Sequence, residues 1–145
     1  MFKAIFFLTM FFVDMPSAVA EIMTAKCASF TGYTVDVQNS NFDKTPMDLE
    51  KTKGIEYTVV MEIGSKEAVI TRLGPKPIRE VGRIVSDTND LRVIVVNYPG
   101  THFMYSIFLV KELMDVSKHT VNFRISEFGD ELDFVMRGNC KFSFQ

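Results

Sequence analysis

Residues of the types that carry out acid–base, nucleophilic or metal chemistry are few in this chain. The sequence has two histidines. His102 follows the Pro99-Gly100 pair and His119 precedes an alternating apolar pattern, so we expect both at strand ends and in solvent. No nucleophile-elbow, zinc-protease, phosphate-loop or dinucleotide motif is present in the sequence. The sequence therefore favours a protein that is not an enzyme and that uses no cofactor or metal.

Charged residues alternate with apolar ones along several segments. Glu56 and Glu62 share one face of residues 55–63, while Arg124 and Arg137 lie on later segments. Such alternation is typical of a solvated outer face with cross-strand ion pairs, each worth roughly 0.2–1 kcal/mol. The net charge is −2 and both signs are interspersed, which argues against binding of nucleic acid or of an anionic membrane surface.

The two cysteines, Cys27 and Cys140, lie far apart in the sequence. Neither has the C-x-x-C spacing or the adjacent histidine of a redox or zinc site. In an oxidising compartment an even number of cysteines most simply forms disulfides. We therefore predict a Cys27–Cys140 bridge, to which the chain-entropy model assigns almost 5 kcal/mol for a loop of about 100 residues.

The first twenty residues have the pattern of an export signal. Lys3 supplies a positive charge, residues 4–13 are an apolar run, and Ala18-Val19-Ala20 is a small-x-small cleavage site. The run is too short for the roughly 20 residues of a membrane-spanning helix, and Asp14 and Pro16 follow it. We predict a signal peptide over residues 1–20 and one exported domain over 21–145, without an integral membrane span, in a periplasm or outside the cell.

From Cys27 onward the dominant hydrophobic period is two, which indicates strands. Turn-forming residues separate eight such segments, and we expect the turns at Gly64-Ser65, "DTND", Pro99-Gly100, residues 115–117 and "FGDE". The predicted strands cover residues 26–37, 55–63, 66–73, 80–86, 91–98, 102–110, 120–127 and 132–142. This pattern predicts an all-β fold, an antiparallel meander of about eight strands closed as a small barrel or sandwich. If the disulfide joins the first and last strands, a closed barrel is favoured.

One short helix is predicted over residues 45–53. Thr45 can cap it, Pro46 suits its first position, and Asp48 suits its first turn. Gly54 follows at the position where glycine most often ends a helix.

The hairpin at residues 91–110 is apolar on both faces of both strands. If one face serves the core, the other exposes an unusually large apolar patch, a feature that usually marks a contact or a ligand site. The candidate interaction patch comprises Ile94, Val96, Met104, Phe108 and Val110. Three explanations remain open: cover by another segment of the chain, a helix starting at Thr101 in place of the second strand, or a cavity or partner surface.

The sequence thus leads to two non-enzymatic functions. The first is a binding module for an apolar or amphipathic ligand held inside the barrel. Its candidate lining residues are Tyr57, Val59, Met61, Phe103, Tyr105, Phe123, Phe134 and Met136. The alternative is a protein-interaction module, such as an inhibitor, adaptor or envelope subunit, that uses the apolar hairpin face.

Overall fold

The computed structural model describes residues 19–38, 41–48, 52–124 and 127–145, with the backbone alone at 36–38, 41–43, 121–124 and 127–132. The predicted signal peptide therefore lies outside the described residues, except for its last two positions. The described chain forms nine strands: β1 (Ile22–Gln38), β2 (Asn41–Pro46), β3 (Glu56–Glu62), β4 (Glu67–Leu73), β5 (Ile78–Asp87), β6 (Leu91–Tyr98), β7 (Thr101–Phe108), β8 (Leu113–Arg124) and β9 (Glu127–Phe144). Among the described residues there is no helix that is long and apolar enough to cross a membrane.

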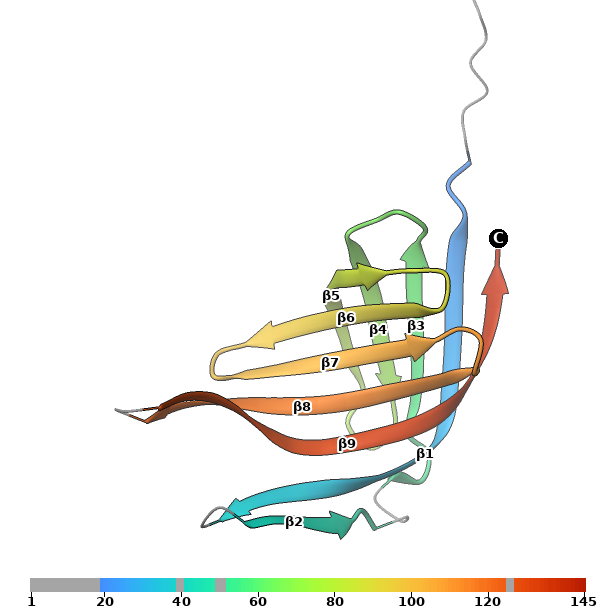
Figure 1. Cartoon of the computed structure of the whole chain (residues 1–145). Helices are drawn as coiled ribbons and strands as arrows, with labels where there is room; N and C mark the ends of the chain where they lie inside the picture. The colour runs from blue at the N-terminus through green and yellow to red at the C-terminus, as the bar shows by residue number, and fades with distance from the viewer. Residues whose placement is uncertain (1–18, 39–40, 49–51, 125–126) are drawn as a thin grey trace, which may run out of the picture.

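The strands form a closed antiparallel barrel. Neighbours in sequence pair from β3 through to β9, and β1 pairs with both β3 and β9. These eight strands, β1 and β3 to β9, make up the barrel. Strand β2 is not part of it and forms a hairpin with the second half of β1. In Figure 1 the strands β3 and β4 cross the direction of β6, β7 and β8, as in orthogonally packed sheets. The predicted all-β, eight-stranded meander is confirmed.

The disulfide closes the seam between β1 and β9. Cys27 and Cys140 are directly opposite each other in the register of these strands, and their sulfurs are 1.98 Å apart. Beyond the bridge, two backbone hydrogen bonds join Ile22 and Gln145, so these two residues lie side by side (Figure 1). The predicted bridge is confirmed, and it is consistent with an oxidising, exported location.

The interior is filled by alternate residues of every strand in the barrel. Four of its buried side chains are methionines, whose flexible thioethers fill irregular spaces. The other buried apolar side chains are mainly aliphatic residues and tyrosines; the four methionines are Met23, Met61, Met114 and Met136. The barrel is therefore a packed core along most of its length.

A bulge in β1 changes which side chains point inward. Pairing with β9 shifts between Ala28 and Thr31, and Ser29 between them has a positive φ of 59°. The shift turns Phe30 into the core, where its ring packs against Gly138; a Cβ at residue 138 would lie 2.6 Å from that ring. The absence of a side chain at residue 138 thus makes room for Phe30.

The segment after β1 differs from the predicted helix. Thr45 and Pro46 end strand β2, and helical backbone is found at Thr52, followed by a turn at Lys53-Gly54. Residues 49–51, in the middle of the prediction, lie outside the described part of the chain. Gly54 has a positive φ of 75°, as expected for the residue that ends such a turn.

The turn predicted at residues 115–117 lies inside strand β8 instead. Asp115 is accommodated there because Arg137 on β9 donates two hydrogen bonds to its carboxylate, each 2.7 Å long. The chain turns earlier, at residues 109–112, where Glu112 has a positive φ of 53°. The segment "FGDE" also belongs to a strand, the first part of β9.

Candidate functional site: an aromatic cavity beside the parting of β5 and β6

Strands β5 and β6 pair along only part of their length. The ladder joins Arg83–Asp87 to Arg92–Val95, whereas the first half of β5 pairs with β4 alone and the end of β6 with β7 alone. A cavity of about 260 Å³ lies where the two strands part. Its lining comes from the five strands β3 to β7: Tyr57, Arg72, Ile78, Glu80, Tyr98, Phe103 and Tyr105.

Two tyrosines form the deep part of this cavity. Tyr57 and Tyr105 are each only 3% exposed, and their ring centroids are 5.8 Å apart in an edge-to-face arrangement. Burial raises the pKa of both hydroxyl groups above the ordinary tyrosine value. Both phenols therefore remain neutral near physiological pH and can act as hydrogen-bond donors.

Glu80 links the deep part of the cavity to its rim. One carboxylate oxygen accepts a 2.5 Å hydrogen bond from the Tyr105 hydroxyl, and the other accepts a hydrogen bond from the Tyr98 hydroxyl. The second bond also raises the pKa of Tyr98. Because Glu80 is on β5 and Tyr98 on β6, this side-chain bond bridges the gap between the two strands.

Arg72 brings a positive charge to the same cavity. Its Nε and Nη2 atoms donate to the carbonyl oxygen of Lys76, at 3.3 and 2.8 Å. The guanidinium also acts on the Tyr57 hydroxyl, partly offsetting the rise in the pKa of that group caused by burial. The loop after β4 therefore holds the arginine in place at the edge of the cavity.

The structure separates the eight predicted lining residues into groups. Tyr57, Phe103 and Tyr105 line the cavity. Val59, Met61 and Met136 are buried in the packed core. Phe134 is half-buried with its ring centroid 6.2 Å from that of Phe103, and the side chain of Phe123 is outside the described part of the structure. The sequence interpretation missed Arg72, Ile78, Glu80 and Tyr98.

The predicted interaction patch does not form a single surface. Ile94 and Val96 are 0% and 5% exposed and belong to the core, so their assignment to an outer face was wrong. Val96 lies against Gly82 of β5, where an added Cβ would come within 3.0 Å of its methyl group. Met104 and Phe108 are half-buried on the outer side of β7, and Val110 is 76% exposed in the next turn.

The outer side of the same hairpin is apolar but not covered by a helix in the described structure. We call this surface the outer hairpin face; its residues are Leu91, Val93, Val95, Met104 and Phe108, all half-buried. Register places Leu91 opposite Phe108 and Val95 opposite Met104, so the side chains cover one another across the two strands. The Lys111 ammonium group also lies 5.9 Å from the centre of the Phe108 ring. Cross-strand packing of these side chains thus takes the place of cover by another segment, which was one of the three open explanations. Thr101–Phe108 is a strand, not the alternative helix.

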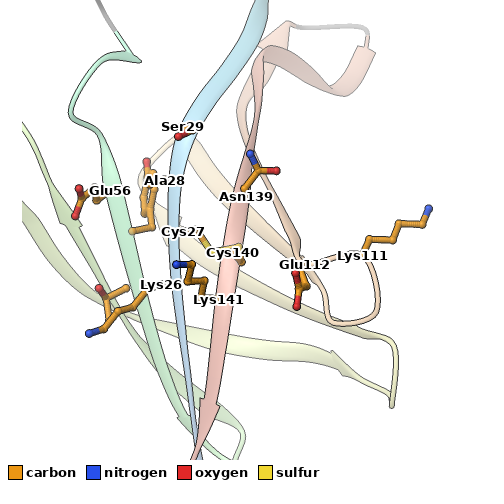
Figure 2. A pocket seen from close by; sticks show the side chains of 12 residues that line it. Lys26, Cys27, Ala28, Ser29, Glu56, Lys111, Glu112, Asn139, Cys140 and Lys141 are labelled. Carbon is orange, nitrogen blue, oxygen red and sulfur yellow. A yellow bond between two sulfur atoms is a disulfide. The ribbon is translucent and has the colours of Figure 1, made fainter.

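A second hollow, of about 540 Å³, lies beside the disulfide (Figure 2). The bulge at Ser29 and the turn at Glu112 border it, and the Glu112 carbonyl accepts a 2.7 Å hydrogen bond from the Cys140 N–H. Figure 2 shows the side chain of Lys111 extending away from the other labelled residues. The irregular backbone of β1 and the β7–β8 turn accounts for this hollow.

The two histidines lie together on neighbouring strands. His102 and His119 are opposite each other in the β7–β8 register, both are half-buried, and their rings stack with centroids 4.8 Å apart. The Ser117 hydroxyl is 3.0 Å from Nε2 of His119. Within the described residues, no group of three or more histidine, cysteine or acidic side chains is arranged to hold a metal ion.

Comparison of the chain with models of protein families, with curated proteins and with solved structures found no match of any of the three kinds.

Proposed function

We propose that the protein is a non-catalytic binding module that holds a small amphipathic ligand in the cavity beside β5 and β6. The supporting observation is the lining of this cavity: four aromatic rings line it, two of them buried, and two charged side chains, Arg72 and Glu80, reach it. Ligand sites typically combine such apolar walls with a few fixed polar groups. The volume of about 260 Å³ is below the roughly 300–1,000 Å³ of sites for drug-sized molecules, so the proposed ligand is small.

The proposal includes export to a periplasm or to the cell exterior. The Cys27–Cys140 disulfide supports this location, because such bridges persist mainly in oxidising compartments. The small-x-small site at residues 18–20 agrees with it.

Blocking the cavity entrance tests the proposal. Ile78 is 39% exposed at the rim, so Ile78→Trp should obstruct the entrance without disturbing the core. We expect a panel of single-ring amphiphiles, including benzoate and phenethylamine, to raise the melting temperature of the wild type by several degrees near saturation. The shift should disappear in Ile78→Trp.

Val81→Trp is the matched control, because Val81 lies on the same strand, is 60% exposed and does not line the cavity. It should keep the wild-type response. The proposal fails if both variants respond alike, or if the amphiphiles cause no shift and native mass spectrometry of the exported protein detects no retained small molecule.

A second candidate function is protein interaction through the outer hairpin face. The observation that favours it is the continuity of apolar side chains on the outside of β6 and β7, next to Val85, which is 55% exposed on β5. Here Phe108→Asp should abolish association with a partner or a second copy, as measured by light scattering after size-exclusion chromatography.

A further inference from the structure

We infer that the ligand of the β5–β6 cavity is a small zwitterion, with an alkylammonium group held by Glu80 and the aromatic rings and a carboxylate held by Arg72. This inference rests on the proposed function, since it names the chemical class of ligand for the same cavity. It depends on three features: two opposite charges that do not pair with each other, aromatic rings at steep angles to one another, and a small volume.

The two charges of the cavity are held apart by other groups. In the described structure, Arg72 and Glu80 line one cavity, but no ion pair joins them. Arg72 is fixed by the Lys76 carbonyl, and Glu80 by the hydroxyls of Tyr98 and Tyr105. A carboxylate has about four acceptor positions and a guanidinium five donors, so each group retains capacity for a ligand. A molecule that carries both charges satisfies the two at once.

The aromatic side chains favour an alkylated cation over a hydrated one. The rings of Tyr98 and Phe103 are at 85° with centroids 6.0 Å apart, and those of Tyr57 and Tyr105 are at 62°. Rings at steep angles to each other form the adjacent walls of aromatic cages, which bind quaternary ammonium groups through cation–π attraction. The Glu80 carboxylate beside these rings adds a direct charge partner. Alkyl groups on the cation would fill the apolar space that a bare ammonium group leaves empty.

The volume limits the size of the ligand. Since one water occupies about 30 Å³ in the liquid, the cavity of about 260 Å³ has room for roughly nine waters. A compact zwitterion such as glycine betaine is close to this size, whereas a long-chain fatty acid is too large. Glycine betaine is therefore a suitable probe.

Three probes that share a compact group with three or four methyls separate the contributions of the two charges. Glycine betaine carries both charges, 3,3-dimethylbutyrate replaces its nitrogen by carbon and keeps only the carboxylate, and tetramethylammonium keeps only the cation. In calorimetric titrations of the disulfide-bonded wild type, we expect glycine betaine to bind at least tenfold more tightly than either single-charge probe. This comparison requires no variant and so does not depend on any substitution being tolerated.

Two variants then assign each charge to its residue. Glu80→Gln should weaken glycine betaine about tenfold and leave 3,3-dimethylbutyrate within twofold of its wild-type affinity. Arg72→Met should weaken the binding of glycine betaine and of 3,3-dimethylbutyrate, which both carry a carboxylate, and leave the binding of tetramethylammonium unaffected. Arg79→Gln is the control, because Arg79 is exposed next to Glu80 in the sequence and does not line the cavity.

The outcomes distinguish this inference from the proposed function. Equal affinities for glycine betaine and 3,3-dimethylbutyrate would overturn the zwitterion assignment, as would binding of single-ring amphiphiles but of none of the three probes; both leave the binding module intact. If neither the probes nor the amphiphiles bind and no small molecule is retained, the inference and the proposed function both fail.

Discussion

Tyr105 contributes to the response of the protein to alkaline pH. Burial and the hydrogen bond to Glu80 raise its pKa in the folded state, whereas the unfolded chain ionises near pH 10. A raised pKa means that the folded state holds the proton more tightly, so its stabilising contribution is complete below pH 10 and is lost as the pH rises further. We expect the urea midpoint to be constant up to about pH 9.5 and then to fall.

Tyr105→Phe should make that alkaline fall shallower, because it removes one of the three tyrosine hydroxyl groups whose pKa is raised in the folded state. At neutral pH the same variant should lose about 1.5–3 kcal/mol of stability, the usual effect of deleting one hydrogen bond to a charged group. Urea titrations between pH 7 and 11 measure both effects. An unchanged alkaline slope would show that Tyr105 does not control it.

Arg92 is an unusual residue of the core. It is 7% exposed. Its Nε atom is 2.5 Å from an oxygen of Asp87 in an ion pair, but neither Nε nor Nη1, both buried, makes a geometrically favourable hydrogen bond with the described groups. Breaking such a pair from the carboxylate side leaves an uncompensated buried charge, whereas replacing the arginine by an apolar side chain removes the cost of burial. Asp87→Ala should therefore destabilise by about 2–3 kcal/mol, and Arg92→Met should be neutral or stabilising.

Chemical denaturation of these two variants measures the asymmetry directly. The side chain of Asp87 is 29% exposed. Water can therefore hydrate its carboxylate in Arg92→Met. A large loss of stability in Arg92→Met would mean that the arginine contributes more through contacts than its burial costs.

At the scale of the elements, the inner and outer faces of the β6–β7 hairpin should respond oppositely to a charge. Ile94→Asp places a carboxylate in the packed core and should prevent folding, with a loss above about 4 kcal/mol. Phe108→Asp changes a half-buried outer residue and should cost about 1 kcal/mol. Circular dichroism melts of both variants test the assignment, and a folded Ile94→Asp protein would contradict it.

The same hairpin shows what a sequence pattern can predict and what it cannot. Its strands, their turn at Pro99-Gly100 and the closing disulfide follow from periodicity and turn chemistry alone. The inward face does not, because both faces are apolar and a shift of one residue exchanges them. The apolar pattern predicts Ile94 on the outer face. In the structure it shares the inner face with Arg92, a residue type that is almost never buried without a partner.

For a related reason, the sequence pattern does not predict the part of the cavity lining that β5 contributes. Within the predicted strand 80–86, Val81 and Val85 are in the more apolar alternating set, yet they are 60% and 55% exposed, and Glu80 and Gly82 face inward. An added Cβ at Gly82 would lie 2.4 Å from the Ile94 side chain. A glycine in mid-strand indicates such close packing, and this was the available signal that Glu80, two residues earlier, shares the inner face.

For the molecule as a whole, the disulfide acts on the stability of the closed barrel. It joins residues 113 positions apart, and the chain-entropy model gives almost 5 kcal/mol for about 100 residues. We expect reduction, or the double variant Cys27→Ala/Cys140→Ala, to lower the unfolding free energy by about 2–5 kcal/mol. The measurement is a urea titration with and without reductant, and equal midpoints would show that the β1–β9 ladder alone sets the stability.

The hydrogen-bonded pair Ile22 and Gln145 has a consequence for protein engineering. Residues that lie side by side can be connected by a short linker, and new ends can be opened in an exposed hairpin turn. The turn at Gly64-Ser65 is suitable, since Gly64 is exposed and nothing lies within 4 Å of a Cβ added there. A circular permutant opened at this turn should retain the barrel with its disulfide. In it, β4 would be the first strand and β3 the last, which converts an internal hairpin into an attachment point for a fused reporter.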